Sequence, residues 1–110
     1  MQKFSAAAVG QDFDQLNSLF RLLSDKTRLT ILFMLANGER NVTSLCRELA
    51  LPQPTVSHHL GLLRTNNVIA NRRKGKQVFY ALNGRVTASG GTELEVAMDR
   101  FRVKIAPAAE

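Results

Sequence analysis

The sequence is poor in the residues that build disulfides and metal centres. It holds one cysteine, Cys46, and two histidines, His58 and His59, among 110 residues. A single cysteine excludes an intrachain disulfide and any zinc site made of several thiolates. Adjacent histidines point about 100° apart on a helix, so these two are badly placed to hold one ion together. We therefore predict a protein with no metal site and no cofactor.

Long apolar runs are missing too, as are the residue patterns of common active sites. No segment reaches the roughly 18 apolar residues that a membrane-spanning helix needs. Residues 1–11 lack the apolar core of a secretory signal, so we expect a cytoplasmic protein with a flexible segment at 1–11 and a flexible tail at 106–110. No Ser/His/Asp constellation, carboxylate pair or glycine-rich phosphate loop is present. We therefore predict that the chain is not an enzyme.

Acidic residues are absent from one long segment. None lies between Leu49 and Thr92, whereas the same segment holds six basic residues: Arg64, Arg72, Arg73, Lys74, Lys76 and Arg85. The rest of the chain is balanced in charge, so the net charge of +6 comes entirely from this segment. A basic surface concentrated in this way attracts polyanions, nucleic acid first among them. The plainer alternative is a solvated basic face without a partner.

Apolar spacing predicts three helices ahead of this basic segment. Residues 12–23 carry apolar side chains at helical intervals. Residues 27–37 are apolar nearly all round, which is typical of a helix at the centre of a core, with Ser24 or Asp25 as its N-cap. A short helix over residues 44–50 would be capped by Thr43.

A fourth helix is predicted to begin near Pro54, whose missing N–H costs nothing in a first turn. It would run to Asn66 or Asn67. Its apolar residues share one face and must point to the core, and its polar residues then face outward. The inward set is Val56, Leu60 and Leu63, and the outward set is Thr55, Ser57, His58 and Gly61.

The last third of the chain predicts a β-hairpin and one more helix. Val78, Tyr80 and Leu82 alternate with other residues, and residues 69–72 can pair with them across a basic turn. Thr92 and Glu95 match a capping box, which predicts a helix over residues 92–105. The order predicts a mainly α protein with a small β-hairpin: a winged helix-turn-helix of five helices and a two-stranded wing over residues 12–105.

Three segments resemble the ArsR/SmtB family of winged-helix repressors. LLSDKTRLTIL resembles the family signature A-D-x-T-R-x-x-I-L, LPQPTVSHHLGLLRTNNVI resembles its recognition helix, and RRKGKQVFYAL resembles its wing. Pro52 stands where the family commonly has Ser or Asn, and Asn67 where it usually has Gly. Asn tolerates a positive φ, so the turn at Asn67 is expected to survive.

The resemblance, together with the charge map, points to DNA as the partner. A helix fits the major groove, and a basic hairpin suits the phosphates or an adjacent minor groove. For His59, close to the buried stripe, we expect a structural or phosphate-contacting role rather than base reading. The predicted DNA-binding residues are Gln53, Thr55, Ser57, His58, His59, Arg64, Arg72, Arg73, Lys74 and Lys76.

The resemblance also implies a homodimer formed by the first and last helices. Two recognition helices would then lie one DNA turn apart and match an inverted repeat near the protein's own promoter, which the dimer would occlude. The residues predicted at the dimer interface are Phe13, Leu16, Phe20, Leu94, Met98, Phe101 and Ile105.

Two alternatives concern what the protein responds to and what it binds. The thiolate positions of the metal-sensing relatives hold Asn41 and Thr43 here, and Cys46 does not match them. A redox- or small-molecule-responsive repressor with an unidentified inducer stays open, although we expect Cys46 to be a core residue. The other alternative is a winged helix that binds RNA or protein, although the chain lacks an aromatic platform for single strands.

Overall fold

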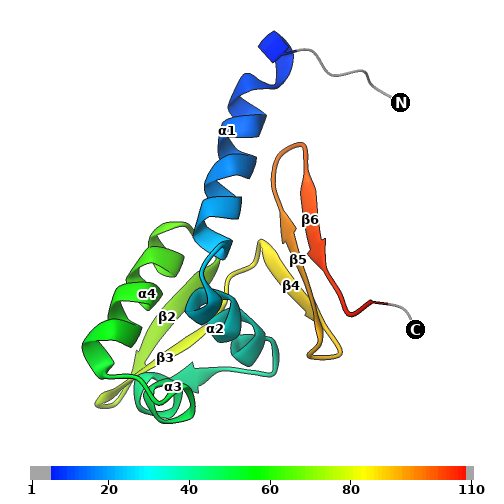
Figure 1. Ribbon diagram of the computed structural model, residues 1–110. Coiled ribbons are helices and arrows are strands. Elements are labelled where there is room, and N and C mark those ends of the chain that lie inside the picture. Colours follow the sequence, from blue (N-terminus) through cyan, green and yellow to red (C-terminus); the bar gives the residue numbers. More distant parts are fainter. Residues whose placement is uncertain (1–5, 109–110) are drawn as a thin grey trace.

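The computed structural model describes the backbone of residues 6–108 and the side chains of residue 10 and of residues 13–108. Over residues 6–108 the chain forms four helices and six strands (Figure 1). The helices are α1 (Ala6–Leu23), α2 (Lys26–Ala36), α3 (Val42–Leu49) and α4 (Gln53–Thr65). The strands are β1 (Arg40–Asn41), β2 (Ile69–Lys74), β3 (Gln77–Leu82), β4 (Val86–Ser89), β5 (Glu93–Ala97) and β6 (Arg102–Ile105).

Two antiparallel sheets flank the helices. The wing sheet has the order β1-β3-β2, and its hairpin pairs Ile69 with Leu82 and Lys74 with Gln77. The second sheet has the order β4-β5-β6. In Figure 1, α1 extends away from the remaining helices and the β5–β6 hairpin rises beside it, whereas the wing tip and the start of α4 lie at the other end.

The core is centred on α2, which packs on α4, on β3 of the wing sheet and on β4 and β5 of the second sheet. Its residues Ile31, Leu32 and Leu35 are buried. A helix surrounded in this way must be apolar on nearly every face, as the sequence predicted for residues 27–37. Leu45 of α3 is fully buried beside it in the same cluster.

Short polar residues set the ends of the helices. Asp25 is the N-cap of α2, and its Oδ1 accepts the backbone N–H of Arg28 at 3.0 Å, which confirms one of the two predicted caps. Asn41 caps α3 by accepting the N–H of Ser44 at 2.7 Å, so the prediction of Thr43 was wrong. The asparagine lies two residues earlier, and α3 already begins at Val42.

The predicted fifth helix over residues 92–105 is wrong. The segment forms β5 and β6, which pair in antiparallel register with Leu94 opposite Ile105 and Val96 opposite Val103. Leu94 and Val96 are buried on the inner face of the second sheet. The turn between β4 and β5 rests on the C-terminus of α2, and a side chain at Gly91 would collide with Asn37.

The wing is also larger than predicted, because β1 adds a third strand beside β3, with Arg40 opposite Tyr80. The hairpin itself is confirmed, and it turns at Gly75, whose φ of 64° is the conformation that glycine adopts most readily. Asn67 has a φ of 61°, as expected for a residue in the glycine position.

The segments predicted to flank the domain, 1–11 and 106–110, lie partly outside the described residues. Residues 1–5 and 109–110, within the segments expected to be flexible, are not described. The helix α1 begins at Ala6 and not at residue 12. Within the described part of the chain, no helix is both long and apolar enough to cross a membrane.

Candidate nucleic-acid interface

The helix α4 is positioned by a tight turn after α3. Ala50 ends α3 in the left-handed conformation, with a φ of 54°, and Leu51 donates its backbone N–H to the carbonyl of Cys46 at 3.2 Å. Pro52 is the N-cap of α4 but offers no side-chain hydrogen bond, and its carbonyl accepts the N–H of Val56 at 3.1 Å. The turn holds α3 and α4 in a helix-turn-helix arrangement.

The two faces of α4 divide as its sequence predicted. Val56, Leu60 and Leu63 are at most 1% exposed, and this burial fixes the rotation of the helix. The side chains of Gln53, Thr55, Ser57 and His58 are exposed and occupy the first turns of the helix. A recognition helix contacts base edges with residues near its N-terminus, so the exposed polar groups stand where such contacts are made.

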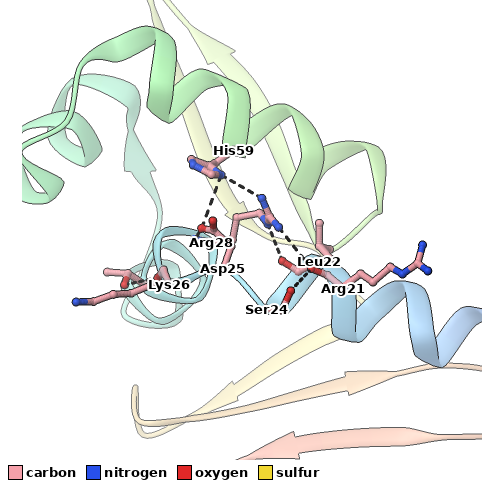
Figure 2. Close-up of polar contacts among 8 residues, drawn as sticks. Arg21, Leu22, Ser24, Asp25, Lys26, Arg28 and His59 are labelled. Atoms are coloured by element: carbon pink, nitrogen blue, oxygen red, sulfur yellow. Dashed lines mark hydrogen bonds and ion pairs between the residues drawn. The ribbon is translucent and has the colours of Figure 1, made fainter.

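His59 faces the body of the protein and not the solvent. Its Nδ1 lies 3.3 Å from Nη1 of Arg28 and 3.9 Å from Oδ1 of Asp25 (Figure 2). Because an arginine only donates hydrogen bonds, Nδ1 is the acceptor in the contact with Arg28. The side chain of His59 is 13% exposed, and the contact ties the middle of α4 to the start of α2.

Arg28 joins three helices. Its Nε donates to the carbonyl of Leu22 at 2.6 Å and its Nη2 to the carbonyl of Arg21 at 3.4 Å, so it satisfies the C-terminal end of α1 (Figure 2). A cation placed against the last carbonyls of a helix also complements the helix dipole. Arg28 thereby connects α1, α2 and, through His59, α4.

The carboxylate of Asp25 completes this cluster. The backbone N–H of Arg28 is the main cause that lowers the pKa of Asp25. Desolvation, the next effect in size, opposes it, and the positive charge of Arg28 lowers the pKa further. Asp25 is therefore ionised at neutral pH, both as the cap of α2 and as the anionic neighbour of His59.

The wing presents basic side chains at its tip. Arg73, Lys74 and Lys76 are exposed around the turn at Gly75. Among the residues that the structure describes, none forms an ion pair or side-chain hydrogen bond with these three. The charge of Lys74 still helps to lower the pKa of Glu39.

Arg72 differs from its neighbours because its guanidinium is engaged. Its Nε and Nη2 each lie 2.7 Å from an oxygen of Glu39, a bidentate pair that connects β2 to the loop before β1. The hydrogen bond from Arg72 is the main cause that lowers the pKa of Glu39, and it raises the pKa of Arg72 in turn. Arg40 and Glu48 form a second ion pair nearby, from β1 to α3.

The residues predicted at a dimer interface lie on the helix α1 and on the hairpin of β5 and β6. Phe13 and Phe20 of α1 are 47% and 52% exposed, and Leu16 is half-buried. Leu94 is buried within the single chain, which leaves it no surface to offer to a partner. Met98, Phe101 and Ile105 are half-buried on the β5–β6 hairpin, where Phe101 stacks on Phe13 with ring centroids 5.8 Å apart.

Cys46 is half-buried and packs against the core cluster. In the described part of the chain, no group of three or more His, Cys, Asp or Glu side chains gathers as metal ligands would. The residues that the sequence reasoning missed are Arg28 as a partner of His59 and Glu39 as the partner of Arg72. The sequence did draw attention to Arg28, because that residue lies in the segment LLSDKTRLTIL, which resembles the family signature. Glu39 lies 33 residues from Arg72, and no sequence pattern connects the two.

The comparison with known proteins agrees with this geometry. Residues 25–70 match the family model of bacterial regulatory proteins of the arsR family. The chain is 35% identical over 71 residues to the transcriptional repressor SdpR of Bacillus subtilis, a match that covers 64% of this chain and 79% of that repressor. It is 42% identical over 71 residues to the arsenical resistance operon repressor of Escherichia coli, of which it spans 61% while 64% of this chain is covered.

A solved structure shares the fold. A homodimeric winged helix-turn-helix DNA-binding domain from Mycobacterium bovis, described as a possible ArsR-family regulator, is 30% identical with a TM-score of 0.62. The match covers 76% of this chain and 75% of that one.

Proposed function

We propose that this chain acts as a homodimer on an inverted repeat near its own promoter. The chain belongs to the arsR family of bacterial regulatory proteins and is a DNA-binding transcriptional repressor. The observation that carries the proposal is the division of α4 into a buried apolar face and an exposed polar face, beside an unpaired basic wing tip. Occlusion of the promoter by the bound dimer is the mechanism. The relatives are repressors and not enzymes.

The exposed face of α4 is proposed to read base edges in the major groove. Thr55, Ser57 and His58 carry short or medium hydrogen-bonding groups, and Gln53 adds an amide at the first turn. An amide can pair with adenine through two hydrogen bonds, and a hydroxyl can serve several bases. Arg64, exposed in the last turn of α4, is assigned to the phosphate backbone.

The wing is proposed to hold the protein on the phosphates through Arg73, Lys74 and Lys76. We assign Arg72 a different role, because DNA contact would have to compete with its bidentate pair with Glu39. That pair braces the wing against the loop before β1. His59 is likewise assigned to positioning α4, because its Nδ1 is already occupied by Arg28.

The homodimer is proposed to form through α1. Phe13 and Phe20 are the large apolar side chains that the described part of the chain leaves exposed, and in Figure 1 their helix stands away from the other helices. A solved relative of the same fold is homodimeric. Such a protein would work in the cytoplasm, where the chromosome lies.

The wing assignment is tested by the salt dependence of binding. Each phosphate contact contributes about 0.9 to the slope of log K against log salt. The double variant Arg73→Gln/Lys76→Gln should therefore flatten the slope by about 1.8 and weaken binding to every DNA sequence. The measurement is a titration of purified protein against the DNA upstream of its own gene at several salt concentrations.

The control removes the same charge elsewhere. Arg102→Gln/Lys104→Gln changes two exposed residues of β6, on the second sheet. It should leave the slope near that of the wild-type protein. An unchanged slope in the wing variant would refute the wing assignment.

Base reading by α4 is tested by discrimination between DNA sequences. His58→Ala should lower the preference for the upstream DNA over random DNA by about 5- to 150-fold, because a good base contact is worth about 1–3 kcal/mol. The salt slope should not change. Equal losses on both DNAs would place His58 on the backbone instead.

A further inference from the structure

A pocket lies away from the proposed DNA-binding surface, among α1, the C-terminal end of α4 and the second sheet. Its volume is about 750 Å³, which is in the size range of small-molecule sites. The walls come from Asp14 to Leu22 of α1, from Thr65, Asn66 and Asn67 at the end of α4, and from Arg85, Met98 and Asp99. The lining mixes hydroxyl, amide and charged groups with an apolar floor.

Arg85 brings to this pocket a buried polar atom that lacks a partner. Its Nε is buried, and none of the described residues accepts a hydrogen bond from it. A buried donor left unsatisfied is costly, more so when it carries charge. Arg85 also belongs to the acid-free segment, yet it lines this pocket instead of extending the basic surface of the wing. An arginine placed in this way is suited to a carboxylate that arrives with a ligand.

The pocket offers groups of both charges. Asp14 lines it from α1, Asp99 from the turn between β5 and β6, and Arg85 from the position before β4. The carbonyl of Arg85 accepts the N–H of Ala97 at 2.9 Å. From Asp14 to Leu22 the wall of α1 extends about 12 Å. A ligand in the pocket can therefore meet a guanidinium and two carboxylates.

We propose that this pocket binds a small organic zwitterion whose carboxylate pairs with Arg85 and whose ammonium group meets Asp14 and Asp99. An apolar spacer between the two charges would lie over Leu19, Leu22 and Met98, which supply the apolar part of the lining. The two aspartates disfavour an anion without a cationic group, and Arg85 disfavours a simple amine.

The pocket is placed to influence DNA binding, a consequence that rests on the proposed function. It touches Thr65, the last residue of α4, and the turn that follows it. Leu22 and Phe13 are nine residues apart, about 2.5 helical turns, so the pocket and the exposed phenylalanine face lie on opposite sides of α1. A dimer formed through the phenylalanines therefore leaves the pocket open.

The test uses 6-aminohexanoate as the probe, with hexanoate and hexylamine as matched compounds that each lack one charge. Two-dimensional proton–nitrogen NMR of the full chain should show saturable shifts of the Arg85 Nε–H and of the amides of Asn66 and Asn67. Loss of one charge-assisted contact corresponds to about tenfold in affinity or more. Hexanoate and hexylamine should therefore bind at least about tenfold more weakly than 6-aminohexanoate.

Variants locate the site and separate it from DNA binding. Arg85→Gln should weaken 6-aminohexanoate at least about tenfold, whereas the control Arg102→Gln should not. Asp14→Asn should weaken 6-aminohexanoate but not hexanoate, and this second variant keeps the test valid if Arg85→Gln fails to fold. An absence of saturable shifts, or equal binding by wild type and Arg85→Gln, would overturn the proposal.

The consequence for regulation is measured separately. Saturating 6-aminohexanoate should change the DNA affinity of the wild-type protein and not that of Arg85→Gln. An unchanged affinity would overturn the regulatory consequence. The NMR titration contains no DNA and therefore tests ligand binding independently. Failure of the ligand-free protein to bind DNA would count against the proposed function and not against the pocket.

Discussion

At the scale of single residues, the two adjacent histidines have opposite surroundings. His58 is exposed on α4, whereas the Nδ1 of His59 lies against Arg28 and close to Asp25. The sequence could predict the direction of each side chain, because helical spacing relative to Val56, Leu60 and Leu63 determines it. It could not supply the partners of His59, since these come from α2, 31 residues away for Arg28. Long-range polar contacts of this kind leave no periodic signal.

Asp25 gives a pH prediction at the same scale. Because folding lowers its pKa below the usual 3.8, its ionised form stabilises the fold above about pH 3.8, and this contribution is lost as the pH falls through the lowered value. Asp25→Ala should lower the Tm at neutral pH by a few degrees, because the cap of α2 is lost. Asp25→Asn keeps a capping oxygen but not the charge. Its Tm should lie slightly below that of the wild type at neutral pH and approach it in acid.

Thermal unfolding followed by circular dichroism, at neutral pH and below about pH 3.8, makes this measurement. Asp14→Asn is a suitable control, because that residue neither caps α2 nor contacts His59. A Tm difference between wild type and Asp25→Asn that stays constant across the pH range would contradict the assignment.

At the scale of elements, the sequence determined α2, α4 and the wing hairpin but misled on residues 92–105. Leu94, Met98, Phe101 and Ile105 follow a helical interval, and Thr92 with Glu95 imitates a capping box. The same segment also alternates, with Leu94 and Val96 in one strand and Val103 and Ile105 in the next. The apolar residues of 92–105 therefore fit both the helical repeat and the alternating repeat of strands. β-branched residues and the turn at Asp99 and Arg100 decided for strands, because pairing with β4 buries Leu94 and Val96 on the core.

The stability of the second sheet provides a prediction at this scale. Leu94 is 1% exposed and belongs to the core cluster, so Leu94→Ala should lower the free energy of unfolding by about 2–5 kcal/mol. Ile105, its cross-strand neighbour, is half-buried, and Ile105→Ala should cost less. Urea unfolding of the two variants compares them directly. A Leu94→Ala variant that is dissociated from its dimer but as stable as the wild type would show that Leu94 faces a partner instead.

At the scale of the whole molecule, the elements proposed to bind DNA and those proposed to form the dimer lie at opposite ends. The start of α4 and the wing tip lie at one end, and α1 with the β5–β6 hairpin extends at the other (Figure 1). Arg28 links the ends, since it bonds the last carbonyls of α1 and the histidine of α4. A fixed angle between α1 and α4 is what a dimer needs in order to set its two recognition helices one DNA turn apart.

The dimer gives the prediction that belongs to this scale. Phe20 is 52% exposed on α1. Phe20→Glu would place two negative charges, one from each chain, at the centre of the proposed apolar dimer contact. Sedimentation should then show a monomer that remains folded, because Phe20 is not part of the core cluster. Affinity for an inverted repeat should fall by about 100-fold or more, since the second half-site is no longer held at high effective concentration.

A charge added elsewhere separates this effect from a general change in net charge. Thr30→Glu introduces the same charge at an exposed position of α2, four residues after Lys26, where a helix tolerates it. It should remain dimeric and keep most of its affinity for the repeat. If Phe20→Glu remains a dimer, contact between the chains must come from the hairpin of β5 and β6 and not from α1. The spacing of the two recognition helices would then be set by the second sheet, and the role of Arg28 in that spacing would be lost.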